Sequence, residues 1–249
     1  MLAALTRRLP LVSGPHDLPD VPALLLERGG EFCVATRIDS AMVAAVCRHG
    51  YLPMSEDWTG RELLLIKSHA ERCILEPSRV QIARSTRRRA PGLRLRVDSD
   101  FARCLERIVA TYADERWLTA RLCDALLSLH ERPTEGVRMR SIEVLAHGEM
   151  VAGEIGYTCG GAYTSLSGFH SVSGAGSVQL ACLGLLLGEA GFALWDLGME
   201  IAYKRALGAF PVDRSRFLER YRSVRDRPTP RIRSDVDCEE LLRRQDSAG

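Results

Sequence analysis

The spacing of apolar side chains along the chain predicts both helices and strands. Over residues 101–112 apolar side chains recur every three or four positions behind Asp98 and Ser99, the pattern of a capped amphipathic helix. A second helical pattern begins near Thr119 and ends before Pro133. The period then changes to two over residues 137–145, which predicts a half-buried strand. The centre of the chain therefore combines consecutive helices with strands.

The remaining patterns extend this order in both directions. Further strands are predicted at residues 62–66, 93–97, 150–157, 162–169 and 192–197. Further helices are predicted at residues 40–48, 176–190 and 213–224, with a short one near Tyr203. Gly160 and Gly161 fit a hairpin turn, and Gly191 fits a helix end. The first forty residues read as irregular and residues 67–79 as a linker. This order predicts an α+β layered fold.

Composition restricts the classes of protein that remain. The 249 residues are 46% apolar and 27% charged, which is typical of a soluble globular protein with one large domain or one domain plus a small one. No apolar run has the roughly 18–20 residues of a membrane span, and no secretory signal is visible, so a cytoplasmic protein is expected. Eight cysteines form no C-x-x-C pair, which favours reduced buried thiols over a metal site.

The distribution of charge says more than the net charge of +2. Seven arginines and no acid lie between residues 79 and 96: Arg79, Arg84, Arg87, Arg88, Arg89, Arg94 and Arg96. A local basic stripe can bind phosphates even on a nearly neutral protein. A solvated arginine-rich face explains the stripe equally well.

Candidate chemistry is scattered, since the chain has no Walker A loop, G-x-S-x-G, H-E-x-x-H or G-x-G-x-x-G motif. Glycines gathered before the helix at 176–190 could present backbone amides to an anion or an ester carbonyl, or could simply form turns. Asp196, at the end of an apolar strand, could accept a proton or orient an amine, or cap a turn. His170 could be a general base or a surface residue, and Trp117 could stack on an adenine or fill the core.

Seven short segments are informative through their order. They are Gly50-Tyr51-Leu52-Pro53, Glu115-Arg116-Trp117-Leu118-Thr119, Arg140-Ser141-Ile142-Glu143-Val144, residues 149–157, the helix from Ser177, Leu194-Trp195-Asp196, and Ala206-Leu207-Gly208-Ala209 followed by residues 214–221. In this order they resemble "GIFPW", "TWI", "HSxEVW", "LVGGLYG", "ASKTAL", "LIDCQ" and "SLGA" with "RRxFL". These are segments of the leucyl/phenylalanyl-tRNA–protein transferase family.

This resemblance implies an architecture and an activity. It implies a small N-terminal domain over residues 1–70 and a GCN5-type acetyltransferase-like domain over residues 71–224; residues 225–249 read as a charged, mobile tail. The activity would move Leu or Phe from aminoacyl-tRNA to the α-amino group of an acceptor protein that begins with Arg or Lys, which marks that protein for degradation. An ester is already activated, so no cofactor or metal is expected, and the protein is expected to be a monomer.

The resemblance also assigns roles to residues. Asp196 and Ser167 are the expected catalytic residues; Asp196 would orient the amine, and Ser167 stands where the family has a functional Glu. Gly198 replaces the Gln of "DCQ". The expected substrate-binding residues are Trp117 (at the adenosine), Glu143, Gly168, Phe169, His170 and Ser171, and the expected tRNA-binding residues are Arg84, Arg87, Arg88 and Arg89. Two other classes remain open: a non-catalytic binder of charged tRNA or protein N-termini, and an acyltransferase that uses another donor such as acyl-CoA.

Overall fold

The computed structural model describes residues 9–115 and 117–244. Arg116, within one of the segments that carry the family resemblance, lies outside the described residues, as do the ends of the ranges 1–70 and 225–249. Helices and strands form two sheets with helices packed on them, so the α+β class predicted from the sequence is confirmed. Within the described part of the chain no helix combines the length and apolarity needed to cross a membrane.

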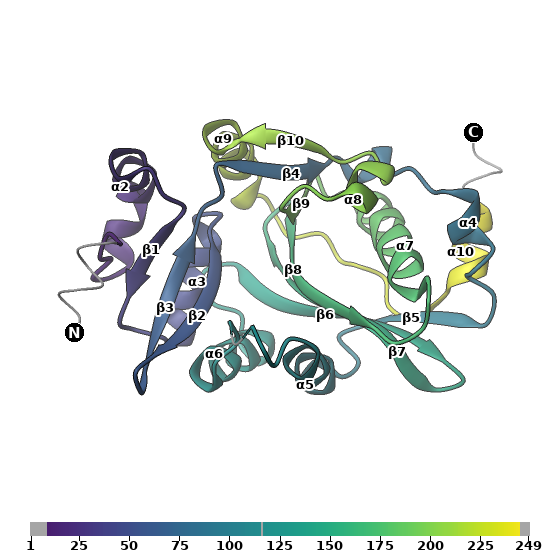
Figure 1. Ribbon diagram of the computed structural model, residues 1–249. Helices are drawn as coiled ribbons and strands as arrows, with labels where there is room; N and C mark the ends of the chain where they lie inside the picture. Colours follow the sequence, from purple (N-terminus) through teal and green to yellow (C-terminus); the bar gives the residue numbers. More distant parts are fainter. Residues whose placement is uncertain (1–8, 116, 245–249) are drawn as a thin grey trace.

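The larger sheet has eight strands in the order β10-β4-β9-β8-β7-β6-β5-β11 (Figure 1). They are β4 (Glu71–Leu75), β5 (Leu93–Val97), β6 (Val137–Ala146), β7 (Glu149–Cys159), β8 (Ala162–His170), β9 (Leu194–Gly198), β10 (Phe210–Asp213) and β11 (Val236–Asp237). Neighbouring strands are antiparallel except β8 and β9, which are parallel. A parallel pair needs a crossover, and α7 (Ala175–Ala190) supplies it.

The smaller sheet lies at the N-terminal side and has the order β1-β3-β2. Its strands are β1 (Phe32–Ala35), β2 (Leu52–Trp58) and β3 (Arg61–Lys67), accompanied by the 3₁₀ helix η1 (Pro15–Asp20), α2 (Val21–Arg28) and α3 (Ser40–Arg48). The chain changes from the small sheet to the large one between Lys67 and Glu71, close to the expected boundary at residue 70. One apolar core joins both sides of that boundary, for example through Met42 and Ile155.

Helices cover both faces of the large sheet. The period of two in β6 divides its side chains: Val137 and Met139 belong to the core beneath α3, α5 (Phe101–Thr111) and α6 (Ala120–Glu131), whereas Ile142 and Val144 belong to the core beneath α7. Figure 1 shows α5 and α6 apart from α7, with the sheet between them. The shorter helices are η2 (Pro77–Arg79), α4 (Arg84–Arg87), α8 (Ala202–Ala206), α9 (Arg214–Arg225) and α10 (Cys238–Arg244).

The elements predicted from long periodic segments are confirmed, and their ends follow the expected chemistry. Asp39 begins α3 by accepting a hydrogen bond from the Met42 amide at 2.9 Å. Asp100 rather than Asp98 or Ser99 caps α5. Gly191 ends α7 at a φ of +88°, a left-handed conformation that favours glycine.

Several predictions for the irregular and short segments were wrong. The first forty residues contain two helices and a strand, in which prolines at the first helical positions replace the usual polar caps. The expected linker at residues 67–79 contains β4, and β2 and β10 were also missed. Short strands of this kind are specified by their neighbours in the sheet rather than by a local pattern.

The segment after Arg225 is ordered rather than a mobile tail over its described part. β11 pairs with β5, and α10 packs against α7. Ile232, Leu241 and Leu242 are no more than 4% exposed. The segment contains few apolar side chains, but these three are buried. Their burial offsets part of the conformational entropy that the charged segment loses when it is ordered.

Candidate active site

A cavity of about 480 Å³ opens where β8 and β9 separate. Their parallel pairing ends at Thr164 and Asp196, and beyond this point the strands diverge. The lining comes from residues 165–170 of β8, from Gly174, Gly176, Ser177, Gln179 and Leu180 at the start of α7, from Leu197, Met199, Tyr203 and Lys204 after β9, and from Tyr112 and Glu154. Diverging parallel strands leave backbone groups unpaired on their facing edges, so this cavity can hydrogen-bond a ligand through main chain as well as side chains.

Four of the expected site residues line this cavity: Ser167, Gly168, Phe169 and His170. They follow one another along β8, where Tyr112 donates a hydrogen bond to the Gly168 carbonyl at 3.0 Å. The expected fifth member of this run, Ser171, does not line it. Its backbone amide and hydroxyl both donate to the Val151 carbonyl, so the structure gives it a role in ending β8.

The N-terminus of α7 forms one wall of the cavity and depends on glycine. Gly174 caps α7 at a φ of +86°, and a Cβ at this position would overlap Cδ of Arg89. Both the backbone conformation and the close approach of Arg89 therefore require glycine. Amides at the start of a 16-residue helix carry a partial positive charge toward the cavity.

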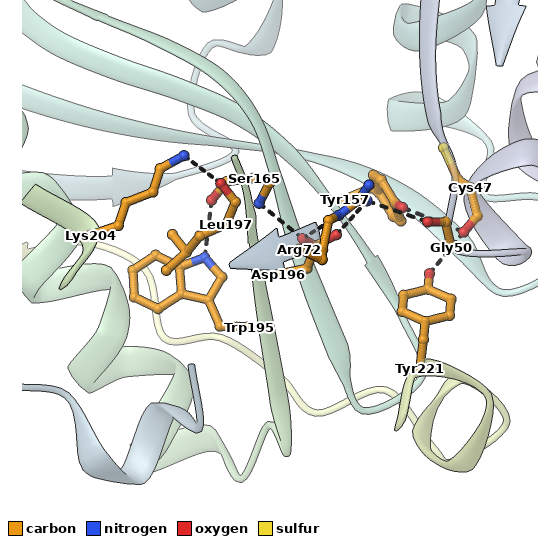
Figure 2. A network of polar contacts seen from close by, with 11 residues as sticks. Cys47, Gly50, Arg72, Tyr157, Ser165, Trp195, Asp196, Leu197, Lys204 and Tyr221 are labelled. Carbon is orange, nitrogen blue, oxygen red and sulfur yellow. Dashed lines mark hydrogen bonds and ion pairs between the residues drawn. The ribbon is translucent and has the colours of Figure 1, made fainter. Parts of the chain in front are cut away.

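Asp196 does not line the cavity, contrary to the expectation that it orients an amine directly. Its side chain is completely buried and forms a two-pronged ion pair with Arg72, with Nε–Oδ1 and Nη2–Oδ2 distances of 2.8 Å (Figure 2). The Gly198 amide donates to Oδ1 at 3.0 Å. Asp196 lies near the end of its strand, as the sequence indicated, but the pairing of β4 with β9 brings a cation to it.

Arg72 was missed because its strand was read as a linker. The signal in the sequence is an arginine followed by an apolar run, Cys73 to Leu75, as expected of a buried strand that carries one charge. Arg72 also donates to the Gly50 carbonyl at 3.3 Å, and its guanidinium lies 4.6 Å from the ring centroid of Phe217. The pair thus joins β4, β9, α9 and the turn after α3 at one point.

Glu154 of β7 is the acidic group of the cavity, and sequence analysis did not single it out. Its side chain is 5% exposed. Oε1 accepts hydrogen bonds from the Ser165 hydroxyl at 2.7 Å and the Tyr163 hydroxyl at 3.1 Å, and Oε2 accepts one from the Gln179 amide at 3.0 Å. Burial raises the pKa of this carboxyl group. The available signal was an acid inside the otherwise apolar strand at residues 150–157.

Lys204, one of only two lysines in the chain, also lines the cavity. Its ammonium donates to the carbonyls of Leu197 and Met199 (Figure 2 shows the bond to Leu197). Burial lowers the pKa of the Lys204 ammonium. These two bonds tie α8 to the end of β9, so Lys204 holds the loop that forms this side of the cavity.

Two further expected residues lie elsewhere. Glu143 is fully buried and accepts from the backbone amides of Ser99 and Asp100 at 3.3 and 3.2 Å, which places it at the start of α5. Trp117 is half-buried and lines a second cavity of about 340 Å³. Tyr112 lines both cavities, so the Trp117 cavity adjoins the first at this residue.

The basic stripe is divided by the fold. Arg94 and Arg96 pair with Asp235, an acid from the C-terminal segment, and Arg87 donates to the Leu242 carbonyl. Arg84, Arg88 and Arg89 are exposed on and just after α4, and the ion pairs formed by described residues do not include them. Because Arg89 contacts Gly174, this remaining cluster reaches the edge of the cavity.

The fold places a cavity between diverging parallel strands, beside an exposed arginine cluster. Sequence comparison identifies the family. A profile of the leucyl/phenylalanyl-tRNA protein transferase family matches residues 74–222. Two curated relatives with this name come from Stutzerimonas stutzeri (strain A1501) and Pseudomonas entomophila (strain L48). Each is 30% identical to this chain; the first covers 86% of this chain and 93% of the relative, the second 88% and 92%. The chain belongs to the leucyl/phenylalanyl-tRNA protein transferase family.

Solved structures resemble the fold only weakly. The C-terminal domain of a putative lysylphosphatidylglycerol synthetase from Agrobacterium fabrum is 13% identical, with a TM-score of 0.42 over 94% of this chain and 76% of that chain. A GCN5-related N-acetyltransferase from Anabaena variabilis is 12% identical, with a TM-score of 0.38 over 80% of this chain and 46% of that chain. The family assignment rests on the sequence comparisons.

Proposed function

We propose that this chain is an aminoacyltransferase that moves an amino acid from aminoacyl-tRNA to the N-terminal α-amino group of an acceptor protein. The observation that carries the proposal is family membership across the segment that builds the cavity. Strands β8 and β9 and helix α7 all lie within the matched residues 74–222. The cavity of about 480 Å³ is of the size that small-molecule sites occupy.

The chemistry needs three contributions that this cavity can supply. A neutral amine must meet the ester carbonyl, the oxyanion must be stabilised as it forms, and both reactants must be held in place. Backbone amides at the start of α7, next to Gly174 and Gly176, support the second contribution because they present partial positive charge. The α-amino group has an ordinary pKa near 8, so a neutral share exists without a strong base.

In this proposal Asp196 is a positioning residue rather than one that touches substrate. It fixes Arg72 and the Gly198 amide and so sets the direction in which the chain leaves β9 to form the cavity wall. Ser167 and His170 line the cavity, and in this proposal they face the acceptor. Asp196 is therefore not the carboxylate that contacts the amine of the substrate.

The tRNA would lie across the arginine cluster at Arg84, Arg88 and Arg89, with its 3′ end in the cavity. The contact of Arg89 with Gly174 supports this path because it joins the cluster to the cavity edge. Arginine is well suited to bind phosphate through its fork of N–H donors. The Trp117 cavity, which shares Tyr112 with the first, is the proposed place for the terminal adenosine.

The finer assignments follow the family resemblance. Leu or Phe is the proposed donor residue, an N-terminal Arg or Lys the proposed acceptor, and degradation of the marked protein the proposed consequence. A monomer in the cytoplasm is the proposed state. Three apolar residues line the cavity: Leu166, Phe169 and Leu180. They favour an apolar aminoacyl side chain as the occupant.

The deciding experiment supplies Leu-tRNA or Phe-tRNA with a labelled amino acid and an Arg-initiated peptide. Label should appear in the peptide, and a peptide with an acetylated N-terminus should stay unlabelled because its nitrogen cannot attack. Tight binding of charged tRNA without transfer from any aminoacyl-tRNA would replace the enzyme with a binding protein. Transfer from acyl-CoA but not from aminoacyl-tRNA would indicate an acyltransferase with a different donor.

A further inference from the structure

Three neutral donors hydrogen-bond the carboxyl group of Glu154. Ser165 receives a hydrogen bond from the Trp195 indole N–H at 3.0 Å, which leaves its hydroxyl proton for Oε1 of Glu154. Tyr163 is fully buried and directs its hydroxyl to the same oxygen, and Gln179 directs its amide to Oε2. All three groups donate, and this arrangement stabilises a carboxylate.

A cationic side chain paired with Glu154 is missing from the described part of the chain. None of the ion pairs there includes Glu154. The charge of Lys204 acts on it, but that ammonium already donates to two backbone carbonyls. A buried carboxylate with hydrogen bonds but no counter-ion is costly. Arg72 and Asp196, by contrast, show what a matched pair looks like in the same sheet.

Glu154 also has the capacity and position to receive a cation from a ligand. It belongs to the lining of the cavity, although most of its side chain is buried. Oε2 accepts a single hydrogen bond, from Gln179, whereas a carboxylate oxygen can accept two. Oε2 therefore keeps an unused acceptor site in a residue that lines the cavity.

We propose that Glu154 is the anionic recognition residue of this cavity and that it binds a cationic nitrogen group of the substrate, an ammonium or a guanidinium. The identity of the substrate rests on the proposed function, but the cationic class does not. Two parts of the proposed substrates carry such a group: the basic side chain of the acceptor's first residue, and the α-ammonium of the aminoacyl ester. The test separates the two sources.

Binding is measured by calorimetry with two matched pairs of probes. The acceptor pair is a peptide that begins with Arg and the same peptide that begins with citrulline, its neutral isostere. The donor pair is a non-hydrolysable phenylalanyl-amide of 3′-amino-3′-deoxyadenosine and the analogue whose α-amine is a hydroxyl. The wild-type protein should prefer the cationic member of one pair by about 10- to 150-fold, the range expected for a hydrogen bond to a charged group.

The variants are Glu154→Gln and Glu154→Met, with Glu149→Gln as the matched control. Gln keeps the shape and removes the charge, and Met removes the buried charge altogether, a change that buried sites often tolerate. Glu149 lies on the same strand with its side chain 77% exposed and outside the cavity lining, so it controls for the loss of one negative charge. Both Glu154 variants should lose the preference, and Glu149→Gln should keep it.

Two results would overturn the proposal: equal wild-type binding of the cationic and neutral members in both pairs, or a preference that survives in a folded Glu154 variant. Neither depends on catalysis. If the wild type transfers no amino acid but shows the Glu154-dependent preference, the proposed function fails and this assignment stands. If transfer occurs and the preference does not depend on Glu154, this assignment fails and the proposed function stands.

Discussion

Replacing only Arg72 or only Asp196 should destabilise the protein far more than replacing both residues of the pair together. Asp196 is 0% exposed and Arg72 1%. Changing Arg72 to Met would leave Asp196 with the Gly198 amide as its donor among the described residues. An uncompensated buried charge of this kind costs about 3–5 kcal/mol. Asp196→Leu should cost a similar amount because it leaves the guanidinium buried with the Gly50 carbonyl and the Phe217 ring as partners.

The double variant is the decisive one, because it removes both charges from the same apolar surroundings. Replacing a complete buried pair by apolar residues of similar volume is often close to neutral. The free energy of unfolding of Arg72→Met/Asp196→Leu should therefore exceed that of either single variant, and the coupling energy should be about 3 kcal/mol or more. Urea unfolding followed by circular dichroism measures all four proteins of the cycle.

An exposed pair provides the control for this cycle. Arg103 and Glu149 lie 3.2 Å apart with side chains 47% and 77% exposed, so their coupling should be only about 0.2–1 kcal/mol. Single-variant losses at Arg72 and Asp196 that simply add in the double variant would refute the reasoning, because the two charges would then be stabilised independently of each other.

Four other outcomes are expected. Arg88→Ala/Arg89→Ala should reduce the magnitude of the negative slope of log tRNA affinity against log salt by roughly one unit for each phosphate that the variant no longer neutralises, and an unchanged slope would leave the cluster as a solvated face. Trp117→Ala should cost about 1–3 kcal/mol of charged-tRNA affinity if the ring stacks on adenine; a stability loss of roughly 3–5 kcal/mol with normal affinity would instead indicate a core residue. Ser167→Glu should raise transfer to an Arg-initiated peptide relative to a Leu-initiated one, since a carboxylate would face the acceptor; unchanged labelling would remove this position from acceptor recognition. Burial lowers the pKa of His49 from 6.5 to about 4, so the native state stays neutral where the unfolded chain binds a proton, and stability is lost as the pH falls from 6.5 toward 4; urea midpoints of His49→Gln should fall less over this range than those of the wild type.

Local patterns were sufficient wherever a segment was long and one of its faces was buried. The helix at Phe101–Thr111 and the first half of the strand at Val137–Ala146 show their period in the sequence, because burial of one face requires it. The turn glycines, such as Gly191, were also readable, since their backbone conformation excludes most other residues. The strand predicted at residues 162–169 likewise placed Ser167, Gly168 and Phe169 on one element before the cavity was known.

The C-terminal segment shows where local reasoning fails. Its composition is that of a flexible tail, yet Val236 pairs with Leu95. Asp235 forms ion pairs with Arg94 and Arg96, so the charges of these two arginines in the basic stripe are neutralised. Along the chain the stripe consists of seven arginines without an acid. The fold supplies the acid from far away, as the separation of 141 residues between Arg94 and Asp235 shows.

The class of fold, the order of the main elements and, through short segments in a fixed order, the family could all be read from the amino-acid sequence. The partners of the buried polar side chains, by contrast, were decided only by the tertiary structure. Asp196 became half of a buried ion pair because β4, a strand of five residues, lies beside β9. Glu154 became the acid of the cavity because Tyr163, Ser165 and Gln179 converge on it from β8 and α7. Periodicity records which face of an element is buried, whereas the partner of a buried charge depends on contacts between segments that the chain brings together only when it folds.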